Sequence, residues 1–555
     1  MNGSVKPRKL SIGLRLCILL LFLLTACSDA PPHAAEEPGR VNQEQNANTD
    51  SAAANAKWMS IGITRAPGSF NPLDRPDWSS FRISSVLFPP LMELDEDLTF
   101  VPMLADRVET KDNQTFTVHL NPKAKWTDGN PVTAEDVMFS LEMIMHPNLS
   151  SIMSSQFSPL EGLDSQGKFS GGAIADFPGA QIIDEFTVQF RMKSPVDPVV
   201  FYEKIAANLK AVPKHILEGV DPDKLTQHPF MFNPSVSYGP FRFVSYQKNQ
   251  YVELGANPDY FKGAPKINKL YFKIMPASNL AAQLQSGEIH MNFPEIGAIE
   301  LWDYERVKNL SNVRTIEGKP VNWKFVGVNA RKLDVTIKQA FAYGMNRTMI
   351  VESLFKGSGE IANGPFPSIH PYFNDKFKDA YPYDPQKAKR MLQDAGWDPN
   401  RVLDFIVPTG QGFEPVADVL IQNLKDIGVE ARMQKLDTPA AVAKIIKGDY
   451  DLFMLNMGFL LDPDRAFIYQ TGATNNFTGY SNPEMDRLLQ EGLMTTDPQE
   501  RKAIYTRFSE LFMRDLPEIP LYADYRLRAV SKSVKVGEPK DIGMLIHVHE
   551  WDIEN

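Results

Sequence analysis

Residues 449–467, DYDLFMLNMGFLLDPDRAF, join the features of a buried strand to those of a polar loop. The apolar run 452–455 has the length of a strand covered on both faces, and Gly458 after it allows the backbone to turn. Asp462 and Asp464 follow in the loop. Because ligands of open α/β sheets bind beyond the carboxyl ends of strands, this stretch predicts the floor of a cleft. The alternative is an ordinary strand exit with Asp-Pro as turn chemistry.

The segments before this strand alternate between extended and helical patterns. Residues 405–408 and 429–436 predict strands, whereas residues 416–427 and 440–446 carry apolar side chains at helical spacing. Such an alternation is typical of strands joined by right-handed crossovers. We therefore expect an α/β fold with a largely parallel sheet in this half of the chain. At the start of the body, residues 58–64, WMSIGIT, predict a strand with alternating burial.

The composition is that of an ordinary globular protein with two or three domains. The chain has 555 residues, of which 43% are apolar and 23% are charged. Its net charge is −10, and acidic and basic residues are interspersed. A nucleic-acid partner is not expected, because phosphate binding requires a basic face or stripe.

Residues 1–26 have the pattern of a secretory leader, in which basic residues precede the apolar run 16–24, too short to span a bilayer. Leu24-Thr25-Ala26-Cys27 resembles the lipobox of bacterial lipoproteins, which implies that Cys27 becomes the first mature residue and carries the lipid. An ordinary secretory signal with an incidental cysteine is the alternative. Removal of the leader, which holds four basic and no acidic residues, lowers the net charge from −10 to −14. Cys17 leaves with it, so no internal disulfide is expected.

Residues 27–57 are expected to form a flexible tether. They contain no aromatic residue and only Val41 among the branched aliphatic residues, which is too little apolar surface for a packed core. We expect an extracytoplasmic protein, lipid-anchored at the outer face of the cell membrane, or periplasmic in a host with two membranes.

A strand pattern at residues 115–120 precedes WTDGNPVTAEDVMFS at residues 126–140, where Thr133 and Asp136 approximate the capping box of a helix. This arrangement resembles the most recognisable segment of the extracellular solute-binding protein family 5, the oligopeptide-, dipeptide- and nickel-binding lipoproteins of ABC importers. The resemblance runs from about Trp58 to the C-terminus. It is also carried by residues 87–109, VPKH at 212–215, SYGPF at 237–241, NPDYF at 257–261, the helix 337–345 with Asn346-Arg347, and residues 384–397.

The resemblance implies a two-lobed, periplasmic-binding-protein-like α/β fold of type II, cluster C, with an extra inserted domain. In that plan the N-terminal and C-terminal segments join one lobe, and two adjacent strands form the hinge. The expected boundaries are the leader at 1–26, the lipidated cysteine and tether at 27–57, lobe I at 58–92 with 228–322 and 524–555, the inserted domain II at 93–227, and lobe III at 323–523.

The resemblance also implies a role in transport and no enzymatic activity. The expected protein captures short peptides between its lobes and delivers them to the transmembrane permease of an ABC importer. It works as a monomer, without a cofactor, and the lipid on Cys27 holds it to the membrane. One alternative is the same fold with a non-peptide cargo, such as an oligosaccharide, an opine or a nickel chelate. An alternative of another class is a secreted hydrolase.

Signals for catalysis or metal binding are weak. The sequence contains no G-x-S-x-G, P-loop or H-E-x-x-H motif, and its Ser-x-x-Lys matches look like chance recurrence. His547 and His549 are predicted to lie on one face of a strand, where a metal pair would need a converging third ligand. We expect neither a catalytic nor a metal site.

The expected ligand site has apolar walls with a few placed polar groups. The stretches of Tyr238 and Phe459 line the cleft in the resembling family. The resemblance gives Asp462 a role too, because peptide binders use an Asp in this loop to hold the ligand's α-ammonium; a plain turn residue is the alternative. Arg465 is read as a carboxylate partner or a solvated residue at a helix start. The expected ligand contacts are Phe70, Asn71, Tyr238, Trp323, Phe366, Met457, Phe459 and Asp462.

Overall fold

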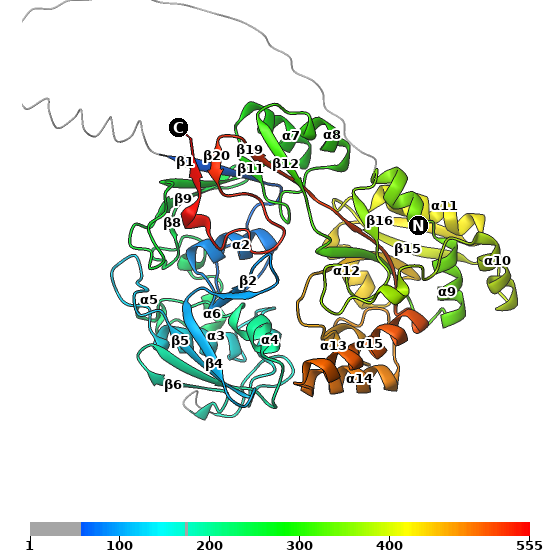
Figure 1. Cartoon of the computed structure of the whole chain (residues 1–555). Helices are drawn as coiled ribbons and strands as arrows, with labels where there is room; N and C mark the ends of the chain where they lie inside the picture. The colour runs from blue at the N-terminus through cyan, green and yellow to red at the C-terminus, as the bar shows by residue number, and fades with distance from the viewer. Residues whose placement is uncertain (1–56, 173–175, 555) are drawn as a thin grey trace, which may run out of the picture. The chain divides into compact units, whose positions relative to one another are not determined.

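The computed structural model describes residues 57–172 and 176–554 (Figure 1). The predicted leader, the lipidation at Cys27 and the tether up to residue 56 lie outside the described residues. Two large sheets and a smaller one organise the described part of the chain.

The first large sheet has the order β12-β19-β11-β1-β10-β9-β8. Its central strand β1 (Trp58–Ile63) runs parallel to both neighbours. The expectation of alternating burial is wrong here, because every β1 residue after Trp58 is buried on a strand covered from both faces. The other strands are β8 (Phe241–Gln247), β9 (Tyr251–Ala256), β10 (Lys269–Ile274), β11 (Met291–Asn292), β12 (Val313–Glu317) and β19 (Leu527–Ser531).

The second large sheet has the order β14-β18-β13-β17-β15-β16. Its strand β15 (Val402–Pro408) pairs in parallel with β16 (Glu430–Leu436) and β17 (Leu452–Gly458). The pairs β13·β17, β13·β18 and β14·β18 are antiparallel, so the expectation of a largely parallel sheet is wrong. The sheet is mixed because β13 (Asn322–Val328) and β18 (Glu518–Asp524) connect directly to strands of the first sheet rather than through crossover helices. The edge strand is β14 (Gly359–Ile361).

Helices cover both faces of the parallel part of this sheet. Leu403 and Phe405 of β15 share a core with helix α11 (Glu414–Asp426), whereas Ile406 shares another core with helix α12 (Thr438–Ile446). Figure 1 shows α11 beside β15 and β16. The strands of this part of the sheet are apolar on both sides because helices cover both faces.

The expected strand of residues 452–455 is present as β17 and is longer than expected. Leu452, Phe453 and Met454 are buried, and burial then alternates to the end of the strand. Gly458 is the last strand residue and pairs with Asn322, so the turn comes after it.

The third sheet, of order β4-β5-β7-β6, is antiparallel and packs on helix α3 (Ala134–Met145). The capping box at Thr133 is present, and the Asp136 carboxylate accepts from the backbone N–H of Thr133 at 3.0 Å. It also accepts from the backbone N–H of Lys214 at 3.0 Å and from Nε1 of Trp126 at 3.3 Å. The strands are β4 (Ala105–Thr110), β5 (Thr115–Leu120), β6 (Ala180–Asp184) and β7 (Thr187–Arg191), and two small pairs are β2 (Met92–Leu94) with β3 (Phe100–Pro102) and β20 (Val534–Val536) with β21 (Asp552–Ile553).

We expect Asp136→Ala to lower the free energy of unfolding by about 2 kcal/mol, because the buried indole N–H of Trp126 and the partly buried backbone N–H groups of Thr133 and Lys214 lose their shared acceptor. Chemical denaturation at neutral pH measures it. Glu135→Ala is the matched control, since Glu135 is exposed and pairs only with Lys214 at the surface, an interaction of about 0–1 kcal/mol. Equal losses in the two variants would contradict this role of Asp136.

Local sequence signals mark the ends of two helices. Helix α10 starts at the cap Asp384, and α7 ends at Gly287 with φ 78°. The remaining helices are α2 (Trp78–Leu87), α4 (Pro198–Phe201), α5 (Lys214–Leu217), α6 (Pro222–Leu225), α7 (Ala277–Ser286), α8 (Tyr304–Lys308), α9 (Val335–Gly344), α10 (Pro385–Asp394), α13 (Ala466–Tyr469), α14 (Pro483–Met494) and α15 (Pro498–Asp515).

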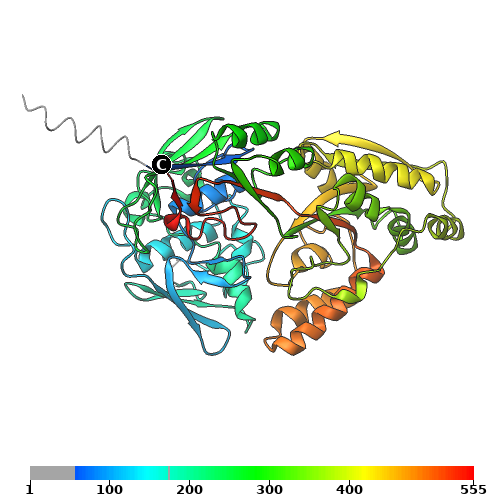
Figure 2. The same cartoon turned by 45° about the horizontal axis from the view of Figure 1, so that its top comes forward.

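Two short connections join the large sheets. Residues 318–321 lead from β12 to β13, and residues 525–526 lead from β18 back to β19 (Figure 2). The two connections touch, since the backbone N–H of Gly318 donates to the carbonyl of Arg526 at 2.9 Å. A side chain at Gly318 would place its Cβ 2.6 Å from that carbonyl oxygen, so the close approach requires glycine.

The histidine pair near the C-terminus does not lie on a strand, so that expectation is wrong. Residues Val548–Glu550 form a 3-10 turn, with His549 buried and His547 about half exposed. Over residues 57–172 and 176–554, no group of three metal-ligating side chains comes together.

Candidate functional site

The loop after β17 directs its two acidic side chains into the protein. Residues 459–465 are termed the acidic loop below. The Asp462 carboxylate accepts from the backbone N–H of Asp464 at 2.9 Å and from Nη2 of Arg501 at 2.7 Å. The Asp464 carboxylate accepts from the backbone N–H of Ala466 at 2.9 Å and from Nζ of Lys204 at 2.8 Å. Each carboxylate oxygen therefore has a partner from within the chain.

Arg501 lies in the first turns of α15, where the cap Asp497 and Pro498 start the helix. Its side chain is 1% exposed and bridges two acids: Nη2 bonds Asp462, and Nη1 lies 3.4 Å from the Asp197 carboxylate. Nε donates to the carbonyl of Gly492 at 2.9 Å. The guanidinium is thus a buried charge held by three groups, the arrangement that a buried arginine requires.

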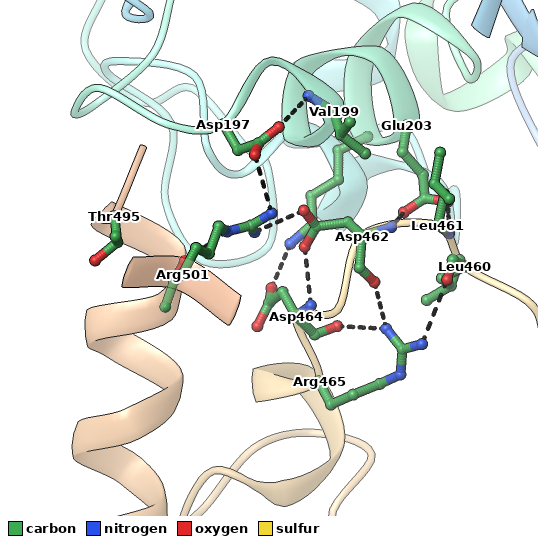
Figure 3. A network of polar contacts seen from close by, with 12 residues as sticks. Asp197, Val199, Glu203, Leu460, Leu461, Asp462, Asp464, Arg465, Thr495 and Arg501 are labelled. Atoms are coloured by element: carbon green, nitrogen blue, oxygen red, sulfur yellow. Dashed lines mark hydrogen bonds and ion pairs between the residues drawn. The ribbon is translucent and has the colours of Figure 1, made fainter. Parts of the chain in front are cut away.

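The partners on the opposite side come from residues 197–204. Asp197 caps α4 by accepting from the N–H of Val199, and a π-helix (Tyr202–Ala206) then presents Glu203 and Lys204. The Glu203 carboxylate accepts from the backbone N–H of Leu461 at 2.7 Å and of Asp462 at 3.0 Å (Figure 3). Single-turn π-helices are frequent at functional sites.

These contacts join two separate hydrophobic cores. Phe201 and Ile205, beside Lys204, pack in the core of the first and third sheets. Tyr469, just after the acidic loop, packs with Phe508 of α15 in another core. The polar contacts of the acidic loop are therefore a bridge between two bodies that are packed independently.

Arg465 is fully buried, so its interpretation as a solvated helix-start residue is wrong. Its Nη1 donates to the carbonyls of Asp462 at 2.6 Å and Asp464 at 2.9 Å, and the guanidinium lies over the Phe366 ring at 5.1 Å. Arg465 therefore holds the backbone of the acidic loop in its turned conformation.

The environment shifts the pKa values of Glu203, Asp464 and Lys204. Burial, followed by the charge of Asp462, raises the pKa of Glu203 to about 7. For Asp464, burial disfavours the charge, but the charge and hydrogen bond of Lys204 outweigh it and hold the pKa below its ordinary value. Burial likewise opposes the charge of Lys204, and Asp464 reverses this so that the pKa of the ammonium is raised. The Lys204–Asp464 pair is therefore ionised at neutral pH.

The expected ligand contacts of the second sheet fall into two groups. Trp323 of β13 is paired with Met457 of β17 and packs with it. Phe366 stacks on His370 with centroids 4.5 Å apart, and Phe459 lies 5.5 Å from the same imidazole. Met457 and Phe459 are partly exposed, whereas Trp323 and Phe366 are buried.

The remaining expected contacts lie in the core of the first sheet. Phe70 packs on Phe243 and Tyr246, and the Asn71 side chain accepts from the N–H of Leu73 at 2.9 Å. Tyr238 is fully buried; its hydroxyl donates to the carbonyl of Pro89 at 2.6 Å and accepts from the N–H of Ala211 at 3.1 Å. The structure does not bring these three side chains to the acidic loop.

Sequence reasoning missed Asp197, Glu203, Lys204 and Arg501. Only Arg501 had a local signal, a charged side chain in the first turns of an otherwise ordinary helix. The three others come from the inserted segment, more than 250 residues before the acidic loop, and nothing in their local pattern indicates the contact.

Glu518 of β18 is a second buried acid near the site, 2% exposed. Burial raises its pKa to about 8, with Arg465, Tyr469 and Trp323 as its polar neighbours.

Since the pKa of Glu518 is higher in the folded protein than in the unfolded chain, the stability that this group contributes is full below about pH 4.5 and is lost as pH rises through 8. Glu518→Gln should therefore match the wild type near pH 5 and be more stable by about 2–4 kcal/mol at pH 8.5. Chemical denaturation at three pH values measures this; parallel curves would contradict it.

Within residues 57–172 and 176–554, no helix is both long and apolar enough to cross a membrane. The family model of the bacterial extracellular solute-binding proteins, family 5, matches residues 99–479. The chain belongs to this family of transport proteins, and its α/β fold with two lobes, each built on one large sheet, is the fold of the family.

Two relatives show how far the similarity extends. The chain is 26% identical to the oligopeptide-binding protein AppA of Bacillus subtilis over 572 residues, which cover 99% of each chain. The structure of that protein in complex with a nonapeptide superposes with a TM-score of 0.77 over 90% of this chain and 99% of that one, at 24% identity. The binding protein CtaP of Listeria monocytogenes gives 0.77 over 90% of this chain and 100% of that one, at 26% identity.

Proposed function

We propose that this protein captures short peptides between its two lobes and delivers them to the permease of an ABC importer. The observation that carries the proposal is the bridge between residues 197–204 and the acidic loop, which joins two independently packed bodies. A ligand held between lobes favours the closed form through contacts that exist only when the lobes meet. The similarity to an oligopeptide-binding protein over the whole chain supports peptides as the cargo.

Met457 and Phe459 are proposed as direct ligand contacts, because both are apolar and partly exposed. Met457 lies near the end of β17, and Phe459 is the first residue of the acidic loop. Trp323, Phe366 and Asp462 are proposed as the buried support of this wall. Phe70, Asn71 and Tyr238 are proposed to support the opposite wall: they hold the loop after β1 and the end of α2. In this way six buried residues would shape a site whose exposed surface is small.

The proposed setting is outside the cytoplasm. The lipid on Cys27 would anchor the monomer to the membrane, and residues 27–57 would let the body reach the permease. The proposed boundaries are 58–92 with 228–322 and 524–555 for lobe I, 93–227 for domain II and 323–523 for lobe III. The two connections between the large sheets would serve as the hinge, since they are the short backbone links between the lobes.

The test is incubation of the purified chain with a pool of peptides of three to five residues, followed by gel filtration and mass spectrometry of the retained and free fractions. We expect intact peptides in the protein fraction. Retention of no peptide would reject this cargo, and the same assay with an oligosaccharide, an opine or a nickel chelate would then identify the class. Shortened peptides would instead indicate a hydrolase.

A further inference from the structure

The acidic loop presents two carboxylates, yet both are neutralised by cations of the chain itself. The Asp462 side chain is 2% exposed and the Asp464 side chain 3% exposed. A ligand cation would need an acceptor oxygen that is both accessible and not already paired. The arrangement leaves little surface for one.

The two internal cations arrive from different directions. Arg501 comes from α15 of the same lobe, so its pair with Asp462 does not itself cross the bridge. Lys204 comes from the inserted segment with 23% of its side chain exposed, and reaches Asp464 across the bridge. Its ammonium, at 2.8 Å from the carboxylate, stands where an external ammonium would have to bind.

The charges around the bridge support this assignment. Four acids, Asp197, Glu203, Asp462 and Asp464, face three cations, Lys204, Arg465 and Arg501. The Glu203 carboxylate is occupied by two backbone N–H groups of the acidic loop and is close to Asp462. An added ammonium would compete with Lys204 for Asp464, because the carboxylate oxygen that Lys204 occupies can be reached only by displacing Lys204 from its anion.

We infer that Lys204 and Arg501 supply the cations of the acidic loop from within the chain, so that a captured peptide binds without an ammonium anchor there. The cargo class is then peptides whose amino-terminal charge is not required, including peptides blocked at the α-amine. Lys204 is the specificity-determining residue, because its ammonium reaches the Asp464 carboxylate of the acidic loop from the other side of the bridge. The inference rests on the proposed capture of peptides.

The test compares a lysine-free pool of peptides of three to five residues with the same pool after Nα-acetylation. Retention is measured on the full-length wild type, Lys204→Met and Lys214→Met. Lys214 lies in the same inserted segment and pairs at the surface with Glu135, so its variant is the matched control. Methionine keeps the length of the lysine stem and removes the ammonium group, both its charge and its hydrogen-bond donors.

We expect the wild type and Lys214→Met to retain the two pools equally, within about threefold, and Lys204→Met to prefer the free-amine pool by about tenfold or more, since a charge-assisted hydrogen bond to Asp464 becomes available. A wild type that retains only the free-amine pool overturns the inference while supporting peptide capture. If the wild type retains neither pool, the proposed function fails. In that case Lys204→Met still tests the inference. If this variant retains the free-amine pool, Lys204 blocks Asp464 in the wild type, as inferred. If it retains neither pool, the inference is rejected.

Discussion

Arg501→Met should lower the free energy of unfolding by about 3–5 kcal/mol, because it leaves Asp462 buried without its cation. Asp197 loses its cation as well, since Nη1 of Arg501 lies 3.4 Å from its carboxylate in the wild type. The charge cannot be replaced by water, since the Arg501 and Asp462 side chains are 1% and 2% exposed. Urea denaturation, followed by the fluorescence of the tryptophans, measures the loss.

Two further variants separate this pair from a general effect of the helix. Arg507→Met, on an exposed position of α15 at 3.8 Å from Glu484, should change the stability by less than about 1 kcal/mol. Asp462→Asn combined with Arg501→Met should recover part of the loss, because the buried Asp462 charge is then removed together with its cation. Strictly additive losses in the double variant would contradict a direct pair.

Gly239→Ala should cost about 3 kcal/mol or more and reduce the yield of folded protein, because overpacking against backbone cannot be relieved by a side-chain rotation. A Cβ on Gly239 would lie 2.0 Å from the carbonyl oxygen of Val86 and 2.8 Å from that of Leu87, at the end of α2. The N–H of Gly239 donates to the same Leu87 carbonyl at 2.8 Å. The measurement is thermal unfolding of the soluble fraction.

The matched control is Gly364→Ala, where a Cβ would meet no atom within 4 Å and φ is not positive. We expect it to remain within about 1 kcal/mol of the wild type. A folded Gly239→Ala protein with unchanged stability would show that α2 and residues 237–241 are not in rigid contact.

Much of the fold was predictable because the local sequence signals for helix ends and strands match the packing of those elements. The capping box at Thr133, the cap at Asp384 and the turn at Gly287 are determined by residues a few positions apart. The same is true of the parallel strands, whose apolar runs require cover on both faces. The mixture of parallel and antiparallel strands in the second sheet was not predictable. Strands β13 and β18 enter this sheet directly from the first sheet, and no local sequence pattern indicates this connection.

The candidate site was predictable only in part, for the same reason. The position of the acidic loop after a buried strand follows from residues 449–467 alone. The partners of that loop do not, because Lys204 and Glu203 become neighbours of Asp464 and Asp462 only through contacts between distant segments. Likewise, the burial of Arg465 depends on the aromatic surface of Phe366, almost 100 residues earlier.

Capture by closure of the lobes is tested most directly by hydrogen exchange at the amides of Leu461 and Asp462, which donate to Glu203 across the bridge. Exchange of residues 459–465 and 197–206 is measured without ligand and with the peptides retained in the pool experiment. Closure predicts slower exchange in both segments, by about tenfold or more, since opening must precede exchange. Peptide binding with unchanged exchange in both segments would contradict capture between closing lobes.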